Sequence, residues 1–503
     1  MKAIYELVMS LTSTEWQSLG NYVTCFSAND KPQKKIWKLA QLIHASTDSF
    51  ETYSSYSIKL YGKVNEEAID RLARNLKYKI LDCLVLTAHS CHEEKSEDRG
   101  DAITKLKKKC LQYHYLLQNK KDLDVTRHLL DEIISMAKEY EAYSELVQHL
   151  KLKNWNYNLR EGEKKFDEGE KEVDKYEKIN HAYASAYNRY AKLNIFYEFS
   201  GKPNENDIIA FLEKAIPEVK EKQASTDSKI ILYYQKILEM DYAMLKENYL
   251  SARSISHEII GIVKTNKSVF TRRRVGTAYD NLAMCVMLLG RFDEAVEYTR
   301  YALQFIQEGS YNYALSKQWE FYALYYNKQY KEAIDCAEAM LEVVKKKELG
   351  GFRYEKFYFL LANAYFAQGD FIKAYNALEN KIEIKEDKEG WEFNWRVLNI
   401  MNNIELGYCD KAGKQTEALK KFIPNNSAKN SFSPRQKTIR KILSHAAQKG
   451  FMFSQLKEKA KDYIEQLSSH DKDYGWQILS AELIPFHVWA ASKMKKGIKV
   501  SVK

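Results

Sequence analysis

The residues best suited to chemistry are two cysteines and two histidines that lie close together, at Cys83, His89, Cys91 and His92. Thiolates and imidazoles at such short spacing are ligands that zinc prefers. However, the CxxC knuckle is missing, and on a helix Cys83 and Cys91 share a face while the histidines lie elsewhere. We therefore expect no metal here, but a buried cysteine and a helix C-terminus at which histidine is favoured.

Catalytic motifs with a recognisable spacing are absent from the sequence. It contains no GxGxxG fingerprint, no phosphate-binding GxxxxGK[ST], no GxSxG and no zinc-binding HExxH. His92-Glu93 and His257-Glu258 begin like the last of these, but neither first histidine is followed by another four residues later. We expect a protein that is not an enzyme and that binds no cofactor.

The composition favours long helices joined by short turns. Only 6 prolines and 19 glycines occur in 503 residues, and these residue types interrupt helices and build the many turns of β folds. No apolar run is long enough to span a membrane, and no secretory signal is recognisable at the start. The 7 cysteines are scattered, which is typical of reduced thiols. These features predict an all-α protein in the cytoplasm, without a membrane partner.

The net charge of +10 is concentrated in the last fifth of the chain. Residues 1–400 carry 59 basic and 59 acidic residues, whereas residues 401–503 carry 19 and 9. A solvated basic surface accounts for such an excess. The alternative is a contact with an acidic protein or with a nucleic acid backbone.

The start of the chain has the signals of a compact helical module. Thr12 and Glu15 form a capping-box pattern, Pro32 is placed to open a helix, and Asn65 is placed to cap another. The strongly polar stretch from His92 to Asp101 breaks the helical pattern, and we interpret it as a linker.

From residue 102 onward the helical period is nearly continuous. Residues 424–434, PNNSAKNSFSP, form the clearest loop of the second half. Three helices are expected after it, within RQKTIRKILSHAAQKG, FSQLKEKAKDYIEQLSS and YGWQILSAELIPFHVWAASKM. The sequence thus predicts an N-terminal helical module at 1–95, a helical repeat array at 102–423 and a basic C-terminal helical cap at 431–503.

One segment of the array occurs twice with the same spacing. Residues 278–303 read AYDNLAMCVMLLGRFDEAVEYTRYAL, and residues 358–378 read YFLLANAYFAQGDFIKAYNAL. Seven positions match in order: Tyr279, Leu282, Ala283, Val286, Gly290, Phe292 and Ala295 with Tyr358, Leu361, Ala362, Tyr365, Gly369, Phe371 and Ala374. The glycine ends one helix, and the small residues allow the next helix to approach closely. Weaker copies contain Ala252 and Ala333, and the second of these fits only with a shortened turn.

This pattern resembles the tetratricopeptide repeat (TPR) family, whose nominal repeat is 34 residues. The matching alanines are 43, 38 and 41 residues apart, so the repeats would be lengthened. The clear resemblance covers residues 230–385. It implies an α-α superhelix, a TPR-like solenoid of antiparallel helix pairs, flanked here by helical N- and C-terminal modules. It also implies binding of a protein or peptide rather than catalysis. A generic helical bundle with a chance match is the alternative.

The resemblance also predicts binding residues, because in TPR-like arrays the positions one step after the buried stripe of each first helix face the hollow. These residues are Asp280, Met284, Met287, Phe359, Asn363 and Phe366. The subclass that grips a C-terminal carboxylate places Lys and Asn at the first two positions, and of these only Asn363 is kept. We therefore expect an adaptable apolar surface for a helix or an apolar segment. The alternative is that a neighbouring helix covers these residues as core.

Two functions are compatible with these features. The first is a cytoplasmic scaffold or adaptor that binds a protein or peptide segment in the concave groove of the array. The second is a regulator or nucleic-acid-associated protein that uses the basic C-terminal helices. Some bacterial TPR-like regulators carry an N-terminal DNA-binding domain, but residues 1–100 contain 13 basic and 13 acidic residues, and this neutrality favours the adaptor.

Overall fold

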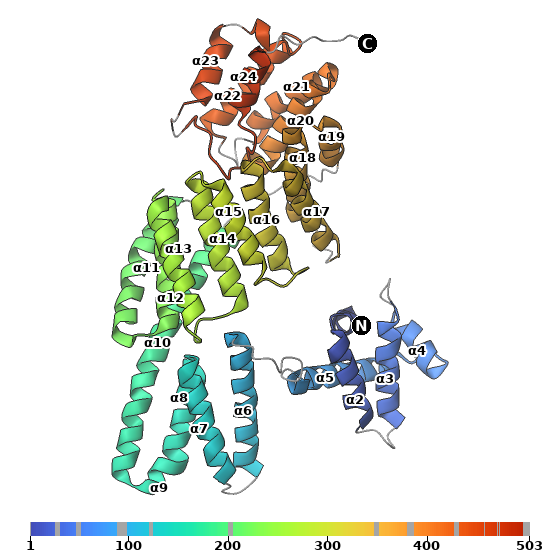
Figure 1. Cartoon of the computed structure of the whole chain (residues 1–503). Helices are drawn as coiled ribbons and strands as arrows, with labels where there is room; N and C mark the ends of the chain where they lie inside the picture. Colours follow the sequence, from blue (N-terminus) through green and yellow to red (C-terminus); the bar gives the residue numbers. More distant parts are fainter. Residues whose placement is uncertain are drawn as a thin grey trace. The chain divides into compact units, whose positions relative to one another are not determined.

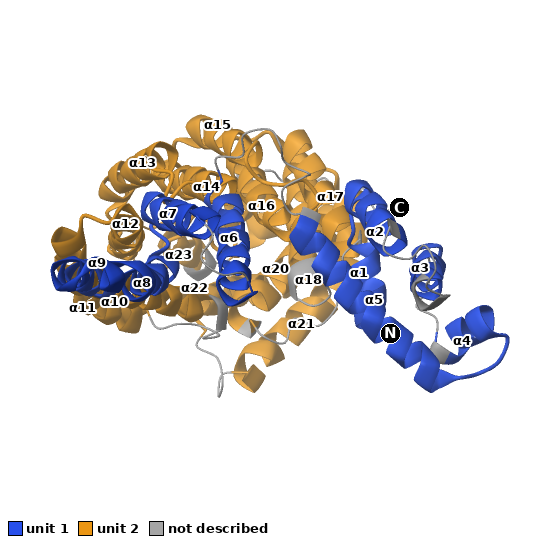
Figure 2. Ribbon diagram, turned by 90° about the horizontal axis from the view of Figure 1, so that it is seen from below, with its two compact units in different colours: residues 1–177 blue, residues 178–503 orange. Residues whose placement is uncertain are grey.

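Every secondary-structure element in the described part of the protein is a helix, as expected of an all-α chain (Figure 1). The computed structural model divides into two compact units, Met1–Glu177 and Lys178–Lys503 (Figure 2). The structure describes residues 2–25, 31–46, 52–87, 98–119, 124–199, 205–346, 352–379, 387–426, 432–456, 458–469, 471 and 473–495.

The first unit begins with a five-helix module. Its helices are α1 (Lys2–Met9), α2 (Ser13–Cys25), α3 (Lys31–His44), α4 (Tyr53–Tyr61) and α5 (Glu66–Thr87). They enclose one hydrophobic core, which includes the fully buried Val8, Leu39, Ile43, Tyr56 and Leu76. Each helix buries one stripe at helical spacing, and this burial stabilises the module.

The helix starts expected for this module are confirmed. The backbone N–H of Thr12 donates to the Glu15 carboxylate at 2.8 Å, and the N–H of Glu15 donates to the Thr12 hydroxyl at 3.3 Å, which is a capping box. The Asn65 side chain accepts from the N–H of Ala68 at 3.0 Å. Pro32 lies in the first turn of α3.

The first unit continues with a series of longer helices. These are α6 (Arg99–Asn119), α7 (Asp124–Glu139), α8 (Tyr143–Lys153), the π-helical turn η1 (Asn154–Asn158), α9 (Leu159–Glu161) and the start of α10 (Glu163–Phe199). The expected linker is therefore shorter than predicted, because α6 begins at Arg99. That guanidinium donates to the carbonyl oxygen of Tyr140 at 3.1 Å and so attaches the start of α6 to the end of α7. The first part of the expected linker, residues 92–97, lies outside the described residues.

The second unit contains a stack of helix pairs. After the end of α10 and α11 (Glu205–Thr226), the pairs are α12 (Lys229–Leu245) with α13 (Tyr249–Thr265), α14 (Arg272–Leu288) with α15 (Phe292–Leu303), α16 (Tyr311–Tyr326) with α17 (Tyr330–Lys346), α18 (Phe352–Gln368) with α19 (Phe371–Glu379), and α20 (Phe393–Glu405) with α21 (Cys409–Asn426). The π-helical turn η2 (Lys388–Glu392) precedes α20. Each helix packs against the next along the chain. This arrangement is a TPR-like solenoid of antiparallel pairs, and it confirms the predicted fold class.

The turn inside each of these five pairs has the same geometry. One residue takes a left-handed backbone conformation, with φ of 58°, 75°, 62°, 90° and 77° at Glu247, Gly290, Lys328, Gly369 and Gly407. The next residue then donates a backbone hydrogen bond to the carbonyl five residues earlier, as Arg291 does to Val286 at 2.9 Å. Five residues after each turn residue stands a fully buried alanine: Ala252, Ala295, Ala333, Ala374 and Ala412.

This common register corrects two details of the sequence analysis. The turn at Lys328 is not shortened, because a lysine takes the left-handed position that glycine takes elsewhere. A fifth copy of the turn, Gly407-x-Cys409-x2-Ala412, was also missed, although a glycine followed five residues later by an alanine is visible in the sequence. The first helix of that pair has diverged more than its turn.

The C-terminal part contains less helix than the sequence indicates. The structure has α22 (Pro434–Ala447), the 3-10 turn η3 (Phe453–Gln455), α23 (Glu458–Leu467) and α24 (Phe486–Lys495). Residues 474–485, expected to be helical, are irregular. The expected loop at 424–434 is also shorter at its described ends, because Pro424 belongs to α21 and Pro434 begins α22.

Candidate protein-binding site

The six predicted groove residues lie on the first helices of two pairs, as expected, but most are not exposed. Met284 is half-buried. The other five are buried, with exposed fractions of 0 to 7%: Asp280, Met287, Phe359, Asn363 and Phe366. The expectation that these side chains form an open groove is therefore corrected. The alternative interpretation, in which a neighbouring helix covers them, describes these five positions.

The covering element is the first helix of the next pair. The Asp280 carboxylate on α14 accepts a hydrogen bond from the Ser316 hydroxyl on α16. The Phe359 ring on α18 stacks on the Trp395 ring of α20 at a centroid distance of 5.7 Å. The first helix α14 thus packs directly on α16, and α18 packs directly on α20. These two contacts bury Asp280 and Phe359.

Two carboxyl groups in this stack have raised pKa values. Burial raises the pKa of Asp280 to about 7, although the hydrogen bond from Ser316 acts in the opposite direction. Burial also raises the pKa of Asp241, on α12, to about 7. No group of three or more His, Cys, Asp or Glu side chains within the described ranges is arranged to hold a metal ion.

The cysteine and histidine cluster of the sequence can be placed only in part. Cys83 lies on α5 and is buried, as expected. His89, Cys91 and His92 lie outside the described residues.

One face of the array remains partly accessible along its whole length. In each of the five pairs, one of its residues lies two positions before the left-handed turn residue. Because the pairs pack in an equivalent way, these residues lie on the same side of the solenoid. We call it the first-helix face, and all five of its residues are half-buried: Leu245, Leu288, Tyr326, Ala367 and Glu405.

The C-terminal part of the chain lies on this face at two of its positions. The Tyr326 hydroxyl accepts a hydrogen bond from the backbone N–H of Leu479 at 3.2 Å, and the Tyr326 ring meets the Trp476 ring edge-on at 6.1 Å. Glu405 accepts from the Trp489 indole at 2.7 Å and pairs with Lys493 at 2.5 Å. The first-helix face thus already binds a polypeptide segment, which belongs to the same chain.

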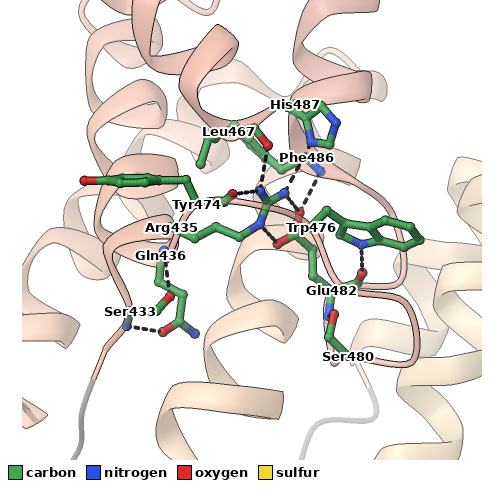
Figure 3. A network of polar contacts seen from close by, with 10 residues as sticks. All are labelled: Ser433, Arg435, Gln436, Leu467, Tyr474, Trp476, Ser480, Glu482, Phe486 and His487. Carbon is green, nitrogen blue, oxygen red and sulfur yellow. Dashed lines mark hydrogen bonds and ion pairs between the residues drawn. The ribbon is translucent and has the colours of Figure 1, made fainter. Parts of the chain in front are cut away.

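The irregular residues 474–485, which we call the strap, are held by Arg435 (Figure 3). Its guanidinium donates two hydrogen bonds to the Glu482 carboxylate, at 2.7 and 2.6 Å, and others to the carbonyl oxygens of Leu467 and Tyr474. Glu482 also accepts from the backbone N–H of Phe486 at 2.8 Å. This buried charge pair orders the strap without regular secondary structure.

The basic excess of the C-terminal region is partly neutralised by such pairs. Besides Arg435 and Lys493, Lys411 lies 3.4 Å from Glu379, and Lys420 lies 2.5 Å from Glu417. Other lysines are exposed: Lys414, Lys421, Lys437, Lys441 and Lys449. A contact between this region and a nucleic acid stays a prediction.

Comparisons with known proteins give likenesses of fold only. No protein-family model matches the sequence, and no curated protein matches it. Among solved structures, BtubC (BKLC) from P. vanneervenii is 17% identical, with a TM-score of 0.39 over 46% of this chain and 95% of that one. A putative kinesin light chain of Podosopora anserina with nearly identical TPR-like repeats is 15% identical, with a TM-score of 0.34 over 39% and 96%.

A third solved structure spans more of the chain. The signal transduction ATPase with numerous domains and a tetratricopeptide repeat sensor from Pyrococcus horikoshii is 12% identical, with a TM-score of 0.39 over 87% of this chain and 66% of that one. All these values are low, so the TPR-like character of the array rests on its own helix pairs. Within the described part of the chain, no helix is both long and apolar enough to cross a membrane.

Proposed function

We propose that the protein is a non-enzymatic scaffold that binds a segment of another protein on the first-helix face of its array. The observation that supports this proposal is the contact between the strap and Tyr326. Because the Tyr326 hydroxyl accepts a hydrogen bond from a backbone N–H, it recognises the main chain of its partner rather than one side chain. The same kind of contact suits an extended segment of a second protein.

The part of the face on α12 and α14 is where we place the partner. Leu245 and Leu288 are half-buried there, and the contacts described above lie elsewhere, those of the strap at α16 and those of α24 at α20. Met284 lies one turn before Leu288 on α14, so the two side chains share a face. Met and Leu together form an apolar surface that adapts to different side chains. An apolar segment of a protein is therefore the occupant that we propose.

The cytoplasm is the compartment that we propose for this scaffold. The five cysteines whose side chains the structure describes are free thiols: Cys83, Cys110, Cys285, Cys336 and Cys409. Free thiols of this kind are typical of a reducing compartment.

A photo-crosslinking residue at position 288 tests the proposal in the native host. We expect the photo-crosslinking residue in place of Leu288 to yield a cross-linked protein. In place of Leu250, which is 64% exposed on α13, it should yield none. The double substitution Met284→Ser and Leu288→Ser should reduce capture of that protein at least tenfold, or about 1.4 kcal/mol. Cross-links to nucleic acid alone, or capture that survives the double substitution in a folded chain, would contradict the proposal.

A further inference from the structure

A second apolar surface lies in the other unit, between α6 and α7. It is a groove with a volume of about 630 Å³, and its lining residues are Leu111, Gln112, Tyr115, Leu116, Val125, Leu129 and Glu132. Leu111 is 64% exposed, Tyr115 61% and Val125 55%. Three large apolar side chains exposed side by side are unusual for a soluble surface and mark interaction sites.

The position of α6 explains why this groove is open. Among the helices with substantial contacts, α7 packs between α6 and α8, whereas α6 packs mainly against α7. The outer helix of a stack of helix pairs normally presents a polar face to water. Here it presents Leu111 and Tyr115, one turn apart on the same side of α6. The groove therefore has the shape and spacing to receive one more helix.

The charges at one end of the groove show which helix would fit. Lys105 is exposed, and the ammonium of Lys108 donates to the carbonyl oxygen of Leu86 and forms no ion pair with a described carboxylate. Lys109 pairs with Glu132 at 2.5 Å, and this contact lowers the pKa of Glu132. The end therefore has more positive than negative charge. At the other end the structure describes Asn119 and Asp124, and of these two residues Asp124 is acidic.

We infer that the α6–α7 groove binds an amphipathic helix of a partner protein, with acidic residues at the end that lies near Lys105 and Lys108. Its apolar residues, at helical spacing, would cover Leu111, Tyr115 and Val125. The acidic end would be attracted by the lysines and would fix the direction of the helix in the groove. This surface is separate from the first-helix face and uses none of its residues.

The test uses two synthetic amphipathic peptides with the same leucine ridge. One carries glutamates in its terminal turn, and the other carries lysines at the same positions. We expect fluorescence anisotropy with the full chain to show at least tenfold tighter binding of the acidic peptide. Leu111→Ser with Tyr115→Ser should weaken that binding about tenfold, or about 1.4 kcal/mol. Leu250→Ser, matched to Leu111 in exposure, should leave it unchanged.

A charge reversal adds a second readout. Lys105→Glu with Lys108→Glu should make the lysine peptide the tighter ligand. Equal binding of the two peptides, or binding that is insensitive to the groove substitutions in a folded chain, would overturn the inference. None of these outcomes bears on the cross-links from Leu288, so the two proposals fail separately.

Two other occupants would also overturn it. The α5 helix has an exposed stripe of Tyr78, Leu81 and Val85. If Leu81→Ser raises the affinity for the acidic peptide, this stripe competes for the groove and is its occupant. If sedimentation shows a dimer that Leu111→Ser dissociates, a second copy of the chain is the occupant.

Discussion

Arg435 shows how a residue of the basic C-terminal region serves the fold. Its side chain is 9% exposed and that of Glu482 10%, so the pair is largely removed from water. Removing one partner leaves the other charge buried, which costs about 3–5 kcal/mol. We expect Arg435→Met or Glu482→Gln to lower the free energy of unfolding by about that amount in urea denaturation. Lys461→Ala, at an exposed pair with Glu458, should change it by less than about 1 kcal/mol.

The predicted groove residues give a second test at the same scale. Phe359 is 1% exposed and Phe366 7%, so a polar replacement creates a cavity in the core. We expect Phe359→Ser and Phe366→Ser to cost about 3–5 kcal/mol each in thermal or urea unfolding. Met284→Ser, at a half-buried position, should cost less. If the melting temperature is unchanged in the phenylalanine variants, these side chains are not core residues, and the original prediction that they bind a partner would be favoured.

Asp280 makes stability depend on pH. Its pKa is about 7 in the folded chain, above the ordinary value of 3.8, so between these values the folded state keeps a proton that the unfolded state loses. Stability therefore falls as pH rises from about 4 to about 7. We expect Asp280→Asn to reduce this fall in unfolding experiments over the same pH range. Asp293→Asn, at an exposed position, should leave the profile as it is.

At the scale of elements, the helix pairs were predicted mainly from the positions of alanines and glycines. Glycine and alanine at a fixed spacing predict the pairs α14–α15 and α18–α19 from the sequence alone. The two pairs with Glu247 and Lys328 at their turns were predicted only as weaker copies, since a left-handed residue that is not glycine has no distinctive signal in one sequence. The sequence left two possibilities for the groove residues, exposed or buried, because burial depends on how closely successive first helices approach, as at Asp280 and Ser316.

The buried alanines are the sites where the register can be tested. Ala295→Leu, Ala374→Leu and Ala412→Leu insert three carbons where helices touch, and each should cost about 1–3 kcal/mol in urea unfolding. Ala418→Leu lies on the same helix as Ala412 but is exposed, so it should be close to neutral. If Ala412→Leu unfolds like Ala418→Leu, the fifth pair does not share the register.

At the scale of the whole molecule, the basic C-terminal region distinguishes the two functions considered from the sequence. Its strongest charge contacts are internal, as at Arg435 and Lys493, and we expect weak binding to DNA or RNA without sequence preference. Such binding should disappear between low and moderate salt in a mobility-shift assay, as counterion release requires. Deletion of residues 431–503 is the matched comparison. A tight complex that discriminates between sequences would favour the nucleic-acid function.

The overall architecture was largely predictable because helical period and scarce proline act along the whole chain. The strap was not, because its order depends on Arg435 and Glu482, which are 47 residues apart. Sequences such as YGWQILSAELIP have the apolar spacing of a helix, and long-range ion pairing overrides that local preference in the structure.

The bond between Tyr326 and Leu479 joins residues 153 positions apart. A ribosome therefore releases the array from α12 to α21 well before the strap exists. The helix pairs contact mainly their neighbours along the chain, so we expect them to fold during synthesis, and Tyr326 then lacks its bond to Leu479 until the strap has also been synthesised. We expect the Tyr326 hydroxyl to be available to other proteins during that interval. We expect chaperones or early partners to meet the array there first, and truncated chains that end before the strap to retain that contact.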